Sequence, residues 1–236
     1  MIVIQKLHKK FGKNEVLTGL DLNIEMGGIF AVLGPNGSGK TTLIKGILGM
    51  VVPNKGNISI DGHSIKNKWK YREGINYLPQ IANFPGNLKV KELIRMIKDL
   101  RQKPSDEEEL ITLFGLEPFL NKKLATLSGG TKQKVNIVLS FMFDNPLIIL
   151  DEPTSGLDPM AMIRLKELIQ KEKKKGKTIL LTSHIMQFVE EIADEIVYLL
   201  EGRIYFKGTI PALKKLTGQT TVERAIAAIT TTPANV

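Results

Sequence analysis

The chain has 236 residues, of which 42% are hydrophobic and 24% charged, a composition that fits one large globular domain or two small lobes. It contains no cysteine, which excludes disulfides and thiolate metal sites. No apolar run approaches the roughly 18 residues of a membrane span. Residues 1–6 are strand-like and do not have the pattern of a signal peptide. These features predict a cytosolic protein.

The formal net charge of +9 has two interpretations. It can mark a surface for nucleic acid or anionic lipid, or it can come from solvated lysines that keep the protein soluble. The densest run, residues 171–177, ends a helical pattern, where cations suit the helix dipole. This favours solvated lysines. The aromatic residues are not interleaved with the basic runs, so no nucleic-acid partner is expected.

Short apolar, β-branched segments alternate with helical patterns along the chain, which predicts an α/β core with a mostly parallel sheet. Residues 1–25 and 56–60 have short strands with turn signals, which predicts a small antiparallel β subdomain. Buried strands of the core are predicted at 29–33, 147–150, 178–182 and 196–200, followed by a hairpin turn at 200–203.

An inserted α-helical subdomain is predicted at about residues 83–145, where no strand pattern is present. An apolar stripe at helical spacing between Leu93 and Leu100 predicts its first helix. Ser105 and Glu108 have the spacing of a capping box, which predicts the start of a second helix. A third helix is predicted to begin near Ser128.

The domain containing this insertion is predicted to occupy residues 1–217, and residues 218–236 are predicted to form a short C-terminal tail. Within the tail, residues 221–229 predict a short helix, and the last few residues are expected to be frayed.

Residues 34–41 fit the P-loop pattern G-x-x-x-x-G-K-[ST], between a predicted strand and a predicted helix. Its glycines let backbone N–H groups face phosphate oxygens, and the helix N-terminus adds partial positive charge. We expect Lys40 to bridge the β- and γ-phosphates and the Thr41 hydroxyl to bind Mg²⁺. The predicted nucleotide-binding residues of this segment are Gly34, Pro35, Asn36, Gly37, Ser38, Gly39, Lys40, Thr41 and Thr42.

Two carboxylates follow the apolar segment 147–150. A carboxylate at the carboxyl end of a strand beside a P-loop can reach Mg²⁺ through a water, which suits Asp151. Glu152 would then face the γ-phosphate as the base that orients and deprotonates the attacking water.

Residues 127–133, with the sequence LSGGTKQ, indicate which class of P-loop protein the chain resembles. They resemble the signature motif of ATP-binding cassette (ABC) proteins, LSGGQ, with Thr131 in place of a glutamine that varies in the family. Other motifs of the family occur in the expected order. Gln80 resembles the Q-loop glutamine, residues 155–158 with Asp158 resemble the D-loop, and His184 resembles the switch histidine. Phe11 stands where the family has an aromatic residue under the adenine.

The resemblance implies an ATPase that works as a head-to-tail dimer, most simply a homodimer. Each ATP would be bound by the P-loop of one subunit and by Ser128, Gly129 and Gly130 of the other, with Asp158 acting across the interface. Glu152, His184 and Gln80 would serve hydrolysis. Mg²⁺ would be bound by Thr41, Gln80 and Asp151.

Three classes of protein contain a P-loop of this kind. The first is the ATPase subunit of a transporter, which needs a separate integral membrane permease and would lie at the cytoplasmic face of the membrane. The second is a soluble cassette protein acting on DNA or ribosomes, and the third is a P-loop kinase or stand-alone NTPase. The signature motif disfavours the third class, and the single cassette disfavours the second. Residues 75–80 and the short C-terminus resemble export-type, multidrug or ABC-2-like systems.

Overall fold

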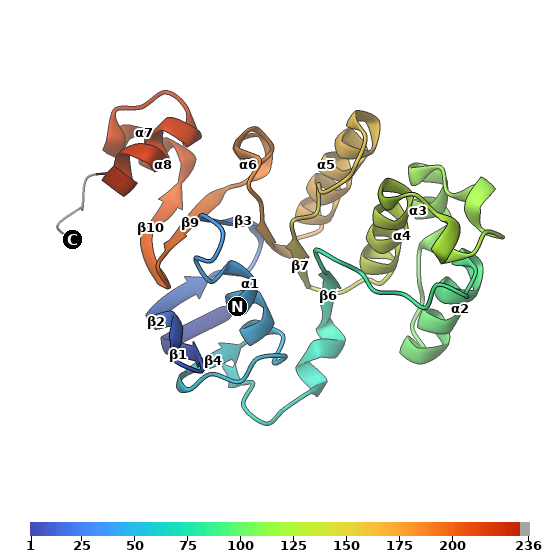
Figure 1. The fold of residues 1–236 in the computed structure, drawn as a ribbon, viewed down its shortest axis with the longest axis horizontal. Helices are drawn as coiled ribbons and strands as arrows, with labels where there is room; N and C mark the ends of the chain where they lie inside the picture. Colours follow the sequence, from blue (N-terminus) through green and yellow to red (C-terminus); the bar gives the residue numbers. More distant parts are fainter. Residues whose placement is uncertain (232–236) are drawn as a thin grey trace.

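The computed structural model describes residues 1–231 (Figure 1), so the frayed end expected at 232–236 lies outside the described residues. The strands are β1 Ile2–Phe11, β2 Asn14–Ile24, β3 Gly28–Leu33, β4 Lys55–Ile60, β5 His63–Ser64, β6 Ile75–Leu78, β7 Leu147–Asp151, β8 Thr178–Thr182, β9 Glu195–Leu200 and β10 Arg203–Thr209. The helices are α1 Lys40–Ile47, α2 Val90–Arg101, α3 Glu107–Phe114, α4 Gly129–Phe141, α5 Pro159–Lys174, α6 Met186–Ile192, α7 Ile210–Thr217 and α8 Val222–Thr231. Short 3-10 turns occur at Lys70–Gly74, Glu117–Phe119 and Leu124–Thr126.

The larger sheet has the strand order β10-β9-β3-β8-β7-β6, and only its edge strand β10 is antiparallel to its neighbour. Every residue of β7 and β8 is buried, as continuous apolar runs in a parallel sheet predict. The α/β core is therefore confirmed. Strand β6 was not predicted, because its Asn76 interrupts the apolar pattern.

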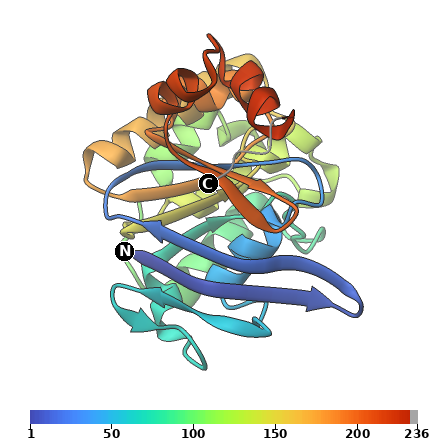
Figure 2. The same cartoon turned by 90° about the vertical axis from the view of Figure 1, so that its left-hand side faces the viewer.

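The smaller sheet has the order β2-β1-β4-β5 with antiparallel pairing, which confirms the antiparallel β subdomain (Figure 2). Its apolar face shares one core with α1 and with one face of the larger sheet. Ile4 and Leu20 from the small sheet, Leu43 and Ile47 from α1, and Val32 from β3 belong to this core. Helix α1 is thus held by apolar side chains of both sheets.

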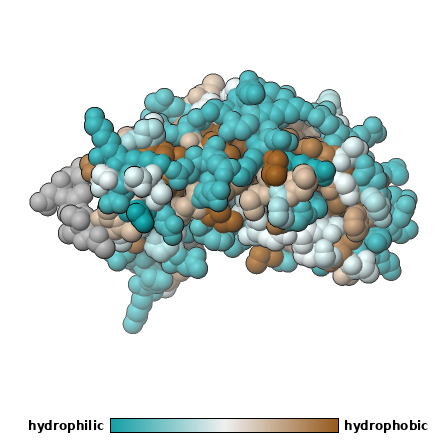
Figure 3. Space-filling view, turned by 90° about the horizontal axis from the view of Figure 1, so that it is seen from above, coloured by the Kyte–Doolittle hydropathy of each residue, from teal (hydrophilic) through white to brown (hydrophobic). Residues whose placement is uncertain are grey.

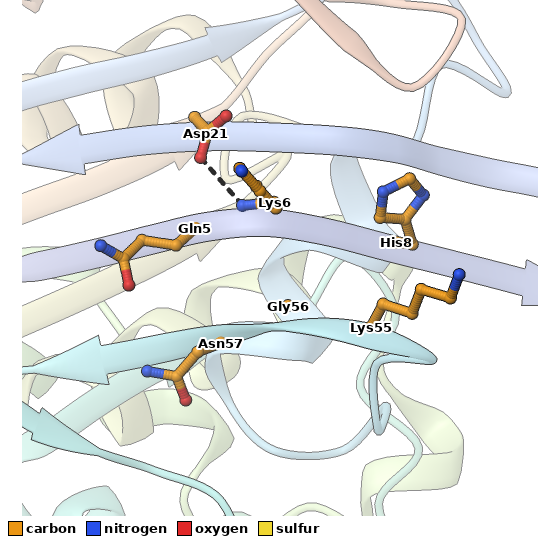
Figure 4. A pocket seen from close by; sticks show the side chains of 7 residues that line it. All are labelled: Gln5, Lys6, His8, Asp21, Lys55, Gly56 and Asn57. Atoms are coloured by element: carbon orange, nitrogen blue, oxygen red, sulfur yellow. Dashed lines mark hydrogen bonds between the residues drawn. The ribbon is translucent and has the colours of Figure 1, made fainter.

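The outer face of the small sheet is hollowed where β1 has a bulge. Lys6 has a φ of 45°, and its N–H donates to Asp21 Oδ1 at 2.8 Å. A Cβ on Gly56 would lie 2.3 Å from the Lys6 carbonyl oxygen, so only glycine fits beside the bulge. The resulting hollow of about 630 Å³ is lined by side chains of three strands (Figure 4).

Helices α2, α3 and α4 lie between β6 and β7 in the chain and form the helical subdomain on one side of the molecule (Figure 1). Helix α4 begins after its N-cap Ser128, as predicted. The capping box at Ser105 was wrong: the N-cap of α3 is Asp106, and its side chain makes no capping bond. The Ser105 hydroxyl donates instead to Glu107 Oε2 at 2.6 Å, one helical position before Glu108.

The helix predicted at 221–229 is confirmed as α8. It packs against α6 and α7, and its Val222 and Ala225 side chains are fully buried. The Tyr198 hydroxyl of β9 also lies 3.0 Å from the Thr230 hydroxyl. Seen from above the view of Figure 1, the surface of the molecule is mostly hydrophilic, with scattered apolar areas (Figure 3). Within residues 1–231, no helix combines the length and hydrophobicity that a bilayer span requires.

The lysine run at the end of α5 is not a solvated face throughout. Lys177 is only 7% exposed, and its ammonium group pairs with Glu172, which is 5% exposed, and with Asp144 at 2.6 Å. Glu172 also pairs with Lys175 at 2.8 Å. The interpretation of the run as solvated lysines was wrong for Lys177, because the start of β8 carries this side chain under α5.

We predict that Lys177→Met destabilises the fold by about 2–3 kcal/mol. Removing one partner of a buried ion pair typically costs about 3–5 kcal/mol, and Lys175 remains to compensate Glu172 in part. Chemical denaturation measures the loss. The control is Lys174→Met, an exposed neighbour without an ion pair among the described residues, which we expect to change stability by less than about 0.5 kcal/mol. Equal effects of the two substitutions would contradict the buried pairing.

Candidate active site

The predicted P-loop connects β3 to α1 and is enclosed by backbone from distant parts of the chain. Gly34 has a φ of 152°, and a Cβ there would lie 2.0 Å from the Leu199 carbonyl oxygen of β9. Gly39 has a φ of 107°, and a Cβ there would lie 2.8 Å from the Leu17 side chain of β2. The Gly202 N–H donates to the Ser38 carbonyl at 3.2 Å. Only glycine fits at positions 34 and 39, so this loop conformation depends on them.

Two polar side chains of the loop differ in how their hydrogen bonds are satisfied. The Lys40 ammonium group donates to the carbonyls of Gly34 at 2.7 Å and Pro35 at 3.1 Å. Burial lowers the pKa of Lys40, while the negative charges of Glu152 and Asp151 act in the opposite direction. The buried Ser38 hydroxyl has no hydrogen-bond partner among residues 1–231. Buried polar groups without partners are rare.

Asp151 and Glu152 lie at the carboxyl end of β7, and both are buried. The Thr182 hydroxyl, at the end of β8, donates to Asp151 Oδ1 at 2.7 Å and accepts from the Glu152 N–H at 2.9 Å. Glu152 has a φ of 50°, a left-handed conformation that costs free energy in a residue with a side chain. We did not predict Thr182 as part of the site, although it is the polar last residue of a predicted parallel strand.

His184 contacts the predicted base directly. Its Nδ1 lies 2.7 Å from Glu152 Oε2. The histidine side chain is 66% exposed, whereas the carboxylate is 9% exposed. The structure therefore brings Lys40, Asp151, Glu152 and His184 to one place at the carboxyl ends of β3, β7 and β8.

Gln80 is exposed just after β6, and the chain before it is attached to α4. The Asn136 side chain donates to the Pro79 carbonyl at 3.0 Å, and the Ser140 hydroxyl donates to the Tyr77 carbonyl at 3.0 Å. The Gln133 side chain donates to the Pro153 carbonyl at 3.1 Å, directly after Glu152. We missed this polar stripe of α4, although polar residues at helical spacing in an apolar helix could have revealed it.

The signature segment forms the N-terminus of α4. Ser128 and Gly129 are exposed, and the Ser128 hydroxyl accepts from the Thr131 N–H at 3.2 Å. A Cβ on Gly130 would lie 2.7 Å from the Gly156 carbonyl oxygen, so the signature and D-loop segments touch. Within residues 1–231, no hydrogen bond or ion pair joins residues 128–130 to the P-loop.

Asp158 is the N-cap of α5, and its Oδ1 accepts from the Ala161 N–H at 2.8 Å. Its Oδ2 pairs with Lys134 of α4 at 2.6 Å. The hydrogen bond from Lys134 holds the pKa of the Asp158 carboxyl below its usual value. The D-loop is thus tied to the signature helix of the same chain.

The remaining predicted residues lie around the P-loop. Phe11 ends β1 and is 51% exposed, with the Lys9 ammonium group 4.7 Å from its ring centroid. Pro35, Asn36 and Gly37 are exposed, and Thr41 and Thr42 are half-buried in the first turn of α1.

Comparisons with known proteins agree with this geometry. The family model described as "ABC transporter" matches residues 17–155, more than half of the chain. The lantibiotic transport ATP-binding protein SrtF of Streptococcus pyogenes is 34% identical over 208 residues, which cover 86% of this chain and 89% of that protein. The Nod factor export ATP-binding protein I of Burkholderia lata is 31% identical over 218 residues, which cover 90% of this chain and 72% of that protein.

Two solved structures are similar over almost their whole length. The structure of an ATP-binding subunit of an ABC transporter has a TM-score of 0.90 at 32% identity, covering 98% of this chain and 99% of that one. A dimeric post-hydrolysis ATP-binding cassette bound to ADP and Pi has a TM-score of 0.79 at 25% identity, covering 89% of this chain and 99% of that one.

The glycine-dependent loop between β3 and α1, the two carboxylates at the end of β7 and the matches in sequence and fold lead to one conclusion: the chain belongs to the ABC transporter family, in which it is an ATP-binding and ATP-hydrolysing subunit.

Proposed function

We propose that two copies of the chain pair head to tail and bind ATP between them. The P-loop of one copy holds the phosphates, and Ser128, Gly129 and Gly130 of the other copy contact the γ-phosphate. The exposed N-terminus of α4 supports this pairing, because its N–H groups and partial positive charge suit an anion. Asp158 lies beside this segment and acts at the interface between the copies.

Within one copy, we assign the triphosphate to the cradle formed by residues 34–42. Successive N–H groups of the loop and the Lys40 ammonium group neutralise its charge. The unpartnered Ser38 hydroxyl supports this assignment, since it lies buried in the cradle. The exposed ring of Phe11 offers a face on which the adenine stacks.

The side chains near the cradle suit Mg²⁺ that arrives with the nucleotide. Among residues 1–231, no group of three or more His, Asp or Glu side chains could hold a metal alone. Mg²⁺ usually combines one or two carboxylates with phosphate oxygens and waters, and this fits Thr41, Gln80 and Asp151. The bound ion would supply charge neutralisation at the phosphates.

For hydrolysis, Glu152 orients the attacking water and accepts its proton, His184 contacts the γ-phosphate, and Gln80 reports nucleotide occupancy to the helical subdomain. One observation carries this proposal: β3 and β7 both pair in parallel with β8, so the P-loop that follows β3 and the two carboxylates at the end of β7 lie at the same edge of the sheet. We infer that Lys40 and the two carboxylates act on the same ligand.

We propose that a separate integral membrane permease completes the transporter, which places the chain at the cytoplasmic face of the membrane. A groove of about 270 Å³ between the core and the helical subdomain suits a short permease helix. Its lining includes Leu48, Met50, Arg72, Ile97, Arg101 and Leu139. The names of the lantibiotic and Nod factor relatives support an export-type system. The domain limits, 1–217 with an insertion at about 83–145 and a tail from 218, stay a prediction.

We predict that Glu152→Gln lowers the rate of ATP hydrolysis by about 10²- to 10⁴-fold, the usual contribution of a general base. ATP binding should persist, and an ATP-bound dimer should accumulate in size-exclusion chromatography. The matched control is Lys40→Ala, which should weaken nucleotide binding itself. Wild-type turnover of Glu152→Gln would remove Glu152 from the role of base.

The head-to-tail arrangement predicts complementation between two inactive variants. Lys40→Ala removes the P-loop cation, and Ser128→Asp keeps an N-cap acceptor on α4 but repels phosphate. Each variant alone should form no working site, whereas every mixed dimer has one complete site. With random pairing, half the dimers are mixed, so the mixture should recover up to roughly one quarter of the wild-type ATPase rate for a two-fold pair.

Ser128→Asn is the control for this experiment, since it also caps α4 but adds no charge. A mixture that stays as inactive as each variant alone, or a fully active Ser128→Asp homodimer, would contradict the shared site.

A further inference from the structure

We propose that the chain carries a membrane-contact surface that binds anionic lipid headgroups. This basic-aromatic patch is made of Lys55, Lys66, Lys68, Trp69, Lys70 and Arg72. Most of it belongs to the segment between β5 and β6, which lies at the opposite end of the molecule from α7 and α8 (Figures 1 and 2).

The patch is built to expose its aromatic residue. Asn67 has a φ of 57°, and the Lys68 N–H donates to the Ile65 carbonyl at 3.0 Å, so the chain turns just before Trp69. Trp69 is 61% exposed and is the only tryptophan of the chain. A hollow of about 540 Å³ separates the segment from the loop that follows α1. On that loop, Val52 is 72% exposed.

The basic residues of the patch have no carboxylate partner in the described part of the chain. Residues 65–72 contain four basic and no acidic residues. Neither these four nor Lys55 forms an ion pair with a carboxylate of residues 1–231. In contrast, Lys171, Lys173, Lys175 and Lys177 at the end of α5 all have carboxylate partners. Carboxylates therefore neutralise most of the densest lysine run of the sequence, whereas within residues 1–231 none pairs with the basic residues of the patch.

An anionic bilayer surface matches this combination of groups. Tryptophan favours the interface between headgroups and acyl chains, and clustered lysines are attracted to anionic leaflets. Exposed Val52 lines the same hollow as the tryptophan and adds apolar contact. The expectation that aromatic residues are not interleaved with basic runs is wrong here, because Trp69 and Tyr71 alternate with basic residues. The Tyr71 hydroxyl is buried, so Trp69 is the exposed aromatic side chain of residues 65–72, and a single such ring makes a poor stacking platform for nucleic acid. The hollow over the β1 bulge also has lysines, but Asp21 lies among them, so its charge is mixed (Figure 4).

The position of the patch is consistent with a membrane contact. Arg72 lines both the hollow of the patch and the groove assigned above to the permease, so the two surfaces are continuous. This step rests on the proposed function. The hollow also borders Gly46, near the end of α1, whereas Lys40 of the P-loop begins that helix about 9 Å away at the usual rise. Substitutions in the patch should therefore leave nucleotide hydrolysis unchanged.

The test uses the purified full-length chain and vesicles of phosphatidylcholine, with or without phosphatidylglycerol. We expect binding to the anionic vesicles only, with a blue shift of the Trp69 emission and a loss of binding in high salt. Lys66→Gln, Lys68→Gln and Lys70→Gln together should weaken vesicle binding roughly 100-fold, since each lysine near such a surface contributes about 5-fold.

The matched control replaces Lys91, Lys123 and Lys215 with glutamine. These lysines are exposed on other faces, and the change in net charge is the same. Equal weakening by both triple variants would show general attraction of a basic protein and overturn the proposal, as would an unshifted Trp69 emission on bound vesicles. A patch variant that binds vesicles normally but loses a detergent-solubilised permease would assign the patch to an acidic protein segment instead. ATPase activity is measured in parallel, so an inactive chain that still binds vesicles would count only against the proposed function.

Discussion

The close approach of three backbone segments at the phosphate cradle is the constraint on which the rest of the molecule depends. The loop between β3 and α1 has its conformation because β9 touches it at Gly34 and β2 touches it at Gly39. A side chain at Gly34 would collide with β9, and a side chain at Gly39 would collide with β2. The antiparallel subdomain, which contributes no predicted catalytic group, is therefore a wall of the nucleotide site.

A second constraint comes from the polar side of α4. Gln133, Asn136 and Ser140 each donate to a backbone carbonyl, one after Glu152 and two in the stretch that leads to Gln80. These bonds join the helical subdomain to both loops that flank the proposed γ-phosphate position. Because the signature segment is the N-terminus of the same helix, a displacement of either loop changes the surface that α4 offers to a second copy.

Much of this architecture could be predicted from the sequence, because it depends on local patterns. The buried strands β7 and β8 are continuous apolar runs, and the P-loop has both a motif and the correct flanks. Strand β6 could not be predicted in this way, because Asn76 is buried only through its hydrogen bonds to the Phe143 carbonyl and the Asn145 side chain, which are distant in the chain. The capping box at Ser105 failed for a related reason: Glu107 pairs with Lys98 of α2, and this tertiary contact determines where α3 begins.

The same contrast between local patterns and tertiary contacts decides which residues of the candidate site could be predicted. The carboxylates and the switch histidine stand beside recognisable motifs, but the role of Thr182 follows only from the register in which β7 and β8 pair. The distribution of charge over the chain shows this contrast most clearly. Composition gives the total, yet only the fold reveals which lysines already have partners and which face outward.

The bonds from Lys40 to the Gly34 and Pro35 carbonyls have a consequence for how tightly nucleotide is held. The ammonium group already has two oxygen partners inside its own loop. Any phosphate oxygen that binds this ammonium group competes with the two carbonyls, so the net free energy gained is that of an exchange between oxygens rather than of a new bond. The same two bonds join the loop to the first residue of α1 within the chain.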